Sequence, residues 1–305
     1  MGTAELACPS LEALCRDKSL DLVAVVTQPD RPKGRDLRLT PSPVKAAALK
    51  HNLPVLQPER ARNQAFVHEL AGLAPDLIVV AAYGQILPRS ILDLPRHGCL
   101  NVHASLLPKY RGAAPIQWAI LEDEKETGVT IMKMDEGLDT GDMLSTAKTP
   151  IAPADTAITL HDRLARLGAE LLVTTIPDYI AGKLKPAPQP AAGATYARKI
   201  SKEDGRIDWS RSAHQIWNQT RAFVPWPGTF TFLDSKVLKI LSATEEPSFS
   251  GEPGTVLCAD KAGLIIACGA GSIRVSTLQV EGGKKLSAAD FLSGHPLAAG
   301  TRLGA

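Results

Sequence analysis

Leu22-Val23-Ala24-Val25-Val26-Thr27 and Leu77-Ile78-Val79-Val80-Ala81-Ala82 are two short, continuous apolar runs in the first third of the chain. Runs of this length without polar alternation are typical of parallel strands that helices cover on both faces. Between the two runs, apolar residues at helical spacing occur over residues 44–49 and 66–73. Strands that alternate with helices in this way predict a doubly wound, mostly parallel α/β domain.

The same alternation continues as far as residue 180. Two further strands are predicted at 99–103 and 129–134, and a long amphipathic helix follows over 160–172, where leucines recur at a spacing near 3.6. Residues 183–194, KLKPAPQPAAGA, contain three prolines and are typical of a linker. We therefore expect a first domain over residues 1–182, a Pro-rich linker over 183–200 and a C-terminal domain over 201–305.

The C-terminal part has a different pattern, with one amphipathic helix around residues 213–220 followed by short strands. Five strands are expected, at 228–233, 236–241, 254–259, 263–268 and 272–277. Five short strands behind one helix fit a small β-barrel of the oligonucleotide-binding type. A small β-sandwich gives the same pattern and remains an alternative. Of the tryptophans at 209, 217 and 226, we expect core positions rather than base-stacking positions.

Composition limits the possible classes of protein. The 305 residues include 44% hydrophobic and 22% charged residues, as in globular proteins of two domains. The net charge of +2 excludes a polycation but permits a local basic patch. No stretch approaches the roughly 18 apolar residues that cross a bilayer, and the N-terminus lacks the pattern of a secretory signal. Five scattered cysteines and seven histidines show neither disulfide nor metal-site spacing, which fits the cytoplasm.

The stretch NVHASLLPKYRG at 101–112 carries the first candidate catalytic residues. Asn101 and His103 are two positions apart at a strand end, so their side chains lie on the same face. A carboxamide and an imidazole placed together can stabilise a developing oxyanion or transfer a proton. Open α/β sheets bind ligands at the carboxyl ends of their strands. The alternative is a strand-end histidine that only bonds a loop carbonyl.

A second stretch, MKMDEGLDTGDML at 132–144, contains a glycine-rich loop with Asp139 at its centre. A buried carboxylate near His103 would orient the imidazole and stabilise its charged form. Asp135 and Asp142 are interpreted as turn residues, which are common in such loops. The composition of the loop does not separate Asp139 from them.

NVHASLLPKYRGAAPIQWAI and TGVTIMKMDEGLDTGDML resemble the formyltransferase family that uses 10-formyltetrahydrofolate. The resemblance continues over nearly the whole chain in TQPDRPKGR, LTPSPVKAAA, AYGQILP, TYARKISKEDGRIDWS and RAFVPWPG. The segment 27–48 and the IDWS…PWPG domain are similar to the members that act on methionyl-tRNA. The resemblance implies a Rossmann-like catalytic domain and a tRNA-binding barrel domain.

The resemblance also implies roles for individual residues. Asn101, His103 and Asp139 match the catalytic Asn, His and Asp of the family. Its folate-contacting turn matches Ser105, Leu106, Leu107 and Pro108. The implied reaction transfers the formyl group of 10-formyltetrahydrofolate to initiator methionyl-tRNA for translation initiation in the cytoplasm. No metal, no membrane partner and a monomer are expected.

The charge of the segment 31–50 by itself indicates a nucleic-acid partner. Six basic residues face one acidic residue, Asp36, a local excess of +5; they are Arg31, Lys33, Arg35, Arg38, Lys45 and Lys50. The segment resembles the tRNA-facing loop of the family, with Arg35 matching its functional arginine. We expect Arg35, Arg31, Lys33 and Arg38 to contact tRNA phosphates. The alternative is a solvated surface loop.

Two functional alternatives and one departure from the family remain. A related enzyme that formylates a nucleotide sugar or glycinamide ribonucleotide would not need the basic segment. A non-catalytic tRNA-binding protein would not need Asn101, His103 and Asp139. Members of the family begin with an apolar strand before a MGTPEFAVPSLEAL-like turn, whereas this sequence opens at MGTAELACPSLEAL. We expect a true start about one strand upstream; the alternative is a genuine short form.

Overall fold

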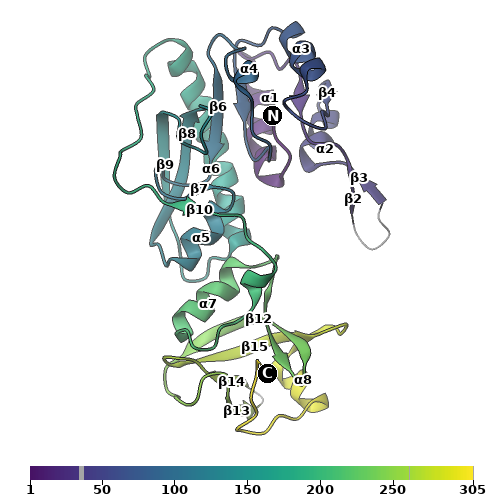
Figure 1. Cartoon of the computed structure of the whole chain (residues 1–305), viewed down its shortest axis with the longest axis vertical. Helices are drawn as coiled ribbons and strands as arrows, with labels where there is room; N and C mark the ends of the chain where they lie inside the picture. The colour runs from purple at the N-terminus through teal and green to yellow at the C-terminus, as the bar shows by residue number, and fades with distance from the viewer. Residues whose placement is uncertain (34–37, 261, 305) are drawn as a thin grey trace. The chain divides into compact units, whose positions relative to one another are not determined.

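The computed structural model of the chain describes residues 1–33, 38–260 and 262–304 (Figure 1). The chain forms two compact units. The first contains residues 1–115, 126–150 and 161–197, and the second contains residues 116–125, 151–160 and 198–305. The second unit thus includes two short segments from the region predicted to form the first domain. The boundaries predicted from the sequence remain a prediction.

The elements of the first unit alternate between short strands and helices. In chain order they are η1 (Glu5–Ala7), α1 (Cys8–Arg16), β1 (Val25–Val26), β2 (Arg31–Lys33), β3 (Arg38–Thr40), α2 (Pro43–Lys50), β4 (Val55–Leu56), α3 (Gln64–Gly72), β5 (Ile78–Val80), α4 (Arg89–Leu92), β6 (Cys99–His103), β7 (Arg111–Gly112), β8 (Glu126–Lys133), β9 (Met143–Pro150) and β10 (Tyr196–Ala197). Two helices, α5 (Pro115–Leu121) and α6 (Ala157–Ile180), belong partly to each unit.

The central sheet of the first unit has the order β5-β6-β8-β9. β5 and β6 run parallel, whereas β6 pairs with β8 and β8 with β9 in antiparallel register. This four-stranded sheet is therefore mixed: β5 and β6 run parallel, and β8 and β9 extend the sheet in antiparallel register. The loop 134–142 between β8 and β9 is too short for a crossover, which takes a dozen or more residues between parallel neighbours.

A separate parallel pair, β1 with β4, lies beside this sheet. Between β1 and β5 is a cavity of about 480 Å³, lined mainly by apolar residues that include 22–26 and 77–79. At one end of the cavity, Gly2 lies between the two strands. The N–H of Gly2 donates to the carbonyl of Val26 on β1, and Gly2 forms a parallel β-bridge with Ala81, the residue after β5. The strand predicted at 22–27 forms only at Val25–Val26, because only these two residues pair with β4.

The second unit is built on antiparallel strands. Its further elements are η2 (Glu203–Gly205), α7 (Ala213–Ala222), β11 (Thr229–Leu233), β12 (Lys236–Glu246), β13 (Val256–Asp260), β14 (Gly263–Ala267), β15 (Ser272–Val280), β16 (Lys285–Ser287) and α8 (Ala288–Gly294). The sheet order is β11-β12-β15-β14-β13, with β16 pairing with β15. The five predicted strands and the helix before them are confirmed.

The core of this sheet is formed by α7 and α8 packing on the strands. Ile216 of α7 and Phe291 of α8 are fully buried against strand residues that include Val275. A capping box between Ser212 and Gln215 begins α7. Within residues 198–260 and 262–304, no pairing joins β13 to β11, so the described strand pairs do not close into a complete barrel.

The three tryptophans of this unit divide between the core and the surface. Trp209 is buried and donates from Nε1 to Thr231. Trp217 is half-buried beneath the guanidinium of Arg221, 4.0 Å from its ring centroid. Trp226 is 54% exposed. The expectation of core tryptophans therefore holds for Trp209 and is wrong for Trp226.

Candidate active site

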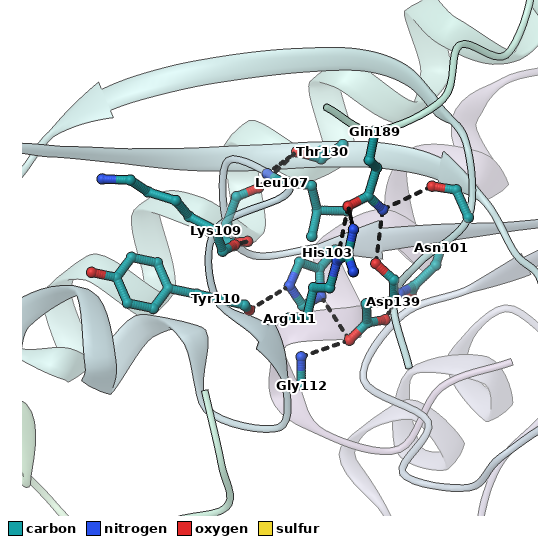
Figure 2. Close-up of polar contacts among 12 residues, drawn as sticks. Asn101, His103, Leu107, Lys109, Tyr110, Arg111, Gly112, Thr130, Asp139 and Gln189 are labelled. Atoms are coloured by element: carbon teal, nitrogen blue, oxygen red, sulfur yellow. Dashed lines mark hydrogen bonds and ion pairs between the residues drawn. The ribbon is translucent and has the colours of Figure 1, made fainter. Parts of the chain in front are cut away.

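Asn101 and His103 lie on β6 and share one face of the strand (Figure 2). β6 is central in the sheet, paired with β5 on one side and with β8 on the other. Its apolar residues Leu100 and Val102 are buried, which anchors the strand, and His103 itself is only 5% exposed. The strand therefore presents the carboxamide and the imidazole from a rigid support.

Asp139 reaches the same place from the loop between β8 and β9. Its φ is +52°, in the left-handed region that residues other than glycine rarely adopt. The loop turns tightly at Gly141, where a Cβ atom would come within 1.9 Å of the carbonyl oxygen of Lys133. This local fold directs the carboxylate of Asp139 back toward β6.

The carboxylate of Asp139 is the common partner of the site. Its Oδ1 accepts a hydrogen bond from Nδ2 of Asn101 at 3.2 Å, and its Oδ2 accepts one from the backbone N–H of Gly112 at 2.9 Å. Oδ2 also lies 3.6 Å from Nδ1 of His103. The structure thus brings together Asn101, His103 and Asp139, whose placement the sequence left open.

His103 is held from its other side as well. Its Nε2 lies 3.0 Å from the backbone carbonyl of Tyr110. A carbonyl oxygen can only accept, so Nε2 carries a proton and Nδ1 is the nitrogen that faces Asp139. The contact with a loop carbonyl, which was the structural alternative for His103, and the expected contact with the carboxylate of Asp139 therefore both occur.

The turn Ser105–Pro108 follows directly after β6. The hydroxyl of Ser105 is buried and donates to the carbonyl of Lys109 at 2.6 Å, and the N–H of Leu107 donates to Thr130 Oγ1 at 3.1 Å. Leu107 is buried, whereas Leu106 and Pro108 stay partly exposed. Ser105 and Leu107 therefore shape the turn, and Leu106 and Pro108 keep part of their apolar surface accessible.

The sequence missed two side chains of the site, Arg111 and Gln189 (Figure 2). Oε1 of Gln189 accepts hydrogen bonds from Nε and Nη2 of Arg111 at 3.0 and 2.7 Å. Its Nε2 donates to the carbonyls of Asp139 and Gly141, each at 2.8 Å. Gln189 lies inside the segment predicted to be a linker, and a single glutamine between two prolines carries no signal of function.

Other candidates near the site have structural roles. Both carboxylate oxygens of Asp135 accept from the hydroxyl of Thr140 at 2.8 Å, and Oδ1 also accepts from the N–H of Gly137, so Asp135 is a turn residue as predicted. Cys99 is buried and donates from Sγ to the carbonyl of Ile91. Burial raises the pKa of its thiol to about 12, which leaves it protonated and unreactive at neutral pH.

The basic segment forms a hairpin, β2 with β3, followed by α2. Arg31 and Arg38 are exposed on this hairpin, and Lys33 is the last residue of β2. Arg31 lies 3.9 Å from Glu59. Lys45 on α2 pairs with Asp30 at 2.7 Å, which offsets part of the local charge excess. Arg35 falls outside the described residues.

The described part of the chain holds neither a cluster of metal ligands nor a membrane-spanning helix. Over residues 1–33, 38–260 and 262–304, no three His, Cys, Asp or Glu side chains are arranged to hold a metal ion. Among the helices described there, none is both long and apolar enough to cross a membrane.

The functional groups of the site suit a reaction between a carbonyl group and an amine. The carboxamide of Asn101 and the imidazole of His103 are donors that match a carbonyl oxygen on which negative charge develops. The carboxylate of Asp139 matches a group that loses a proton. Partly exposed Leu106 and Pro108 add an apolar surface of the kind that lines small-molecule sites. The site therefore fits a co-substrate that presents a carbonyl carbon to an amine.

Comparisons with known proteins agree with this chemistry. Residues 2–176 match the family described as Formyl transferase, and residues 199–296 match the family described as Formyl transferase, C-terminal domain. A protein of Geobacter sulfurreducens named methionyl-tRNA formyltransferase is 52% identical over 100% of this chain and 95% of its own length. One of the same name from Pelobacter propionicus is 53% identical with the same coverage.

A solved structure shares the fold. It is an N-formyltransferase from Helicobacter canadensis in complex with folinic acid and dTDP-3-aminofucose. The TM-score is 0.65 at 20% sequence identity, covering 93% of this chain and 97% of that one. At this identity the likeness concerns the arrangement of the elements alone.

Proposed function

The chain belongs to the formyl transferase family, and from this membership we propose that Asn101, His103 and Asp139 catalyse its reaction. The reaction is the transfer of a formyl group from 10-formyltetrahydrofolate to the α-amine of methionine on initiator methionyl-tRNA. One observation carries the assignment of the residues. The carboxylate of Asp139 accepts from Asn101 at 3.2 Å and lies 3.6 Å from His103, so three side chains of suitable chemistry form one cluster.

The chemical step requires two changes of bonding. 10-Formyltetrahydrofolate supplies the formyl carbon, to which the amine forms a C–N bond while the bond to N10 breaks and a proton moves from the amine to N10. Asn101 and His103 stabilise the negative charge on the formyl oxygen as donors, and for this the Nε2–H of His103 leaves the carbonyl of Tyr110 when the substrate binds. Asn101 has a second N–H on Nδ2 besides the one that it donates to Asp139. Asp139 orients His103 and accepts the proton of the attacking amine.

Binding of the two substrates is assigned to neighbouring segments. Ser105, Leu106, Leu107 and Pro108 form the folate-contacting turn, with Leu106 and Pro108 supplying the accessible apolar surface. The β2–β3 hairpin with Arg31, Lys33 and Arg38, together with Arg35, contacts tRNA phosphates. The exposure of Arg31 and Arg38 supports this role, since phosphate contacts need accessible cations. We place the enzyme in the cytoplasm, because charged initiator tRNA is used there. We also propose that it acts as a monomer.

Formyl transfer to defined acceptors tests this function. The purified protein is given 10-formyltetrahydrofolate labelled in the formyl group, with either methionyl-tRNA or a nucleotide-sugar amine or glycinamide ribonucleotide. We expect label on methionyl-tRNA and none on the small amines. Label on the small amines alone would show the related small-acceptor enzyme. Binding of methionyl-tRNA without any transfer would show a non-catalytic tRNA-binding protein.

A further inference from the structure

The side chain of Gln189 uses its full hydrogen-bonding capacity at the candidate site. Both N–H groups donate, one to the carbonyl of Asp139 and one to that of Gly141, each at 2.8 Å. Its Oε1 accepts twice from Arg111, at 2.7 and 3.0 Å. A primary amide offers two donors and one acceptor oxygen with two lone pairs, so no capacity is left. Gln189 therefore connects the loop that carries Asp139 to the side chain of Arg111 on β7.

The two segments that Gln189 connects are those that direct the Asp139 carboxylate. Asp139 has a φ of +52°, a conformation that residues other than glycine rarely adopt and that persists only when its surroundings hold it. The hydrogen bonds of Gln189 to Asp139 and Gly141 are such a restraint. On the other side, Arg111 directly precedes Gly112, whose N–H donates to Oδ2 of Asp139 at 2.9 Å. Gln189 thus holds the backbone that carries the carboxylate, and it holds the guanidinium of Arg111, the residue next to the one whose N–H donates to that carboxylate.

Gln189 is itself held in place by its own segment. Pro188 and Pro190 flank it, and a residue before proline is restricted to extended conformations. Ala187 and Met143 exchange backbone hydrogen bonds at 2.8 and 2.9 Å, which fastens the segment on one side. On the other side β10 pairs with β7, and Thr195 Oγ1 accepts from the N–H of Tyr110 at 2.8 Å. The predicted linker is therefore attached to the first unit.

We propose that Gln189 is a positioning residue for formyl transfer, through its hold on Asp139 and on Arg111. The proposal rests on the proposed function, because it assigns Asp139 to the chemical step. A segment that the sequence marks only as a connection supplies this residue. Gln189 acts through Asp139, so its loss misplaces the carboxylate and lowers the rate of the chemical step, while substrate binding persists.

The test compares two substitutions at Gln189 that remove different hydrogen bonds. Gln189→Ala removes all four. Gln189→Glu keeps an acceptor for Arg111 but cannot donate to the carbonyls of Asp139 and Gly141. We expect kcat to fall roughly 10–100-fold in both, as small misplacements of catalytic groups do. KM for methionyl-tRNA and for 10-formyltetrahydrofolate should change by no more than about twofold, since a group that acts only in the chemical step leaves binding intact.

Gln219 provides a matched control in the second unit. Its Nε2 also donates to two backbone carbonyls, those of Asp204 and Arg206, at 2.7 and 3.1 Å. Gln219→Ala should lower the melting temperature at least as much as Gln189→Ala, because Gln219 is only 4% exposed, and yet retain the wild-type kcat.

The outcomes separate this proposal from the proposed function. Wild-type protein that transfers no formyl group to methionyl-tRNA contradicts the proposed function itself. Active wild-type protein with both Gln189 variants at wild-type kcat contradicts the positioning role. A fall in kcat shared by Gln219→Ala would also contradict it, because the effect would then reflect stability. A fall confined to the Gln189 variants supports the proposal.

Discussion

Nδ2 of Asn101 donates a hydrogen bond to Oδ1 of Asp139 at 3.2 Å, although the two residues are 38 positions apart in the chain. The register of the sheet explains the meeting. β6 and β8 are antiparallel neighbours with Asn101 opposite Met132 and His103 opposite Thr130, so the loop after β8 returns past Asn101. The geometry of the candidate site therefore depends on a strand pair and on the loop that follows β8.

Loss of either His103 or Asp139 should slow formyl transfer strongly. His103→Ala removes a donor to the formyl oxygen, and Asp139→Asn removes the carboxylate that orients it. We expect each rate to fall by ~10²–10³. Single-turnover transfer from labelled 10-formyltetrahydrofolate to methionyl-tRNA measures it, with Asp142→Asn as the control in the same loop. Wild-type rates in both variants would mean that the cluster takes no part in the reaction.

The tight turn at Gly141 should be required for activity. A Cβ atom at this position would lie 1.9 Å from the carbonyl oxygen of Lys133, so Gly141→Ala must displace the loop that carries Asp139. A displacement of about 1 Å can lower kcat by roughly 10²-fold. Gly72→Ala in α3 is the matched control, because no atom lies within 4 Å of its added methyl group. Steady-state kinetics give kcat for both variants. Equal kcat values for Gly141→Ala and Gly72→Ala would show that activity does not depend on the tight turn.

Arg35 should contribute to tRNA binding through charge. Arg35→Glu should weaken the complex with methionyl-tRNA and leave folate binding and unfolding unchanged. The dependence of log K on log salt should become shallower by about 0.7–0.9 for every phosphate that the variant no longer neutralises. Titrations of methionyl-tRNA at several salt concentrations measure the slope. Lys18→Glu, at an exposed position before the hairpin, makes the same charge change and should keep the wild-type slope. If both variants keep the wild-type slope, the segment is only a solvated surface.

The stability of the protein should depend on pH through His214. Its Nδ1 lies 2.8 Å from Glu245 and its Nε2 lies 3.0 Å from Asp123. The hydrogen bond to Glu245, with a further contribution from Asp123, raises the pKa of His214 above 6.5. The folded state therefore binds the proton more tightly, and this stabilisation is complete below pH 6.5 and lost as pH rises through the raised pKa.

Substitution of His214 should remove that dependence. Relative to the wild type, His214→Gln should be least stable at or below pH 6.5 and approach wild-type stability at higher pH. Denaturant unfolding at a series of pH values gives the free energies. His295→Gln, whose ring stacks on Phe291, is the control and should keep the wild-type pH profile. A constant difference between wild type and His214→Gln across this range would contradict the ion-pair account.

Periodicity predicted much of the fold because most elements are marked by local patterns. α7 and the five strands from β11 to β15 follow directly from spaced apolar residues and turn residues. β16 and α8 were missed, since three residues of strand and a short helix give too little pattern. The antiparallel direction of β8 and β9 does not follow from the pattern, because apolar runs show that a strand is buried but not which way its neighbour runs.

The candidate site was predictable from the residues alone only in part. Asn101 and His103 share a strand face, which their spacing states directly. Asp139 could not be separated from Asp135 by composition, because the difference is a backbone conformation set by the whole loop. Gln189 was invisible for another reason. Its function lies in hydrogen bonds with Arg111 and with two carbonyls that are distant in sequence, and no local pattern encodes them.

The most direct test of the account is a double-mutant cycle on His103 and Asp139. Single-turnover formyl transfer to methionyl-tRNA is measured for His103→Ala, Asp139→Asn and the double variant, with melting temperatures recorded for each. Residues that act as one unit are not additive in their effects. The account predicts that the double variant is about as slow as the slower single variant. Rate losses that multiply would show independent action and contradict a catalytic unit built on the contact between these two side chains.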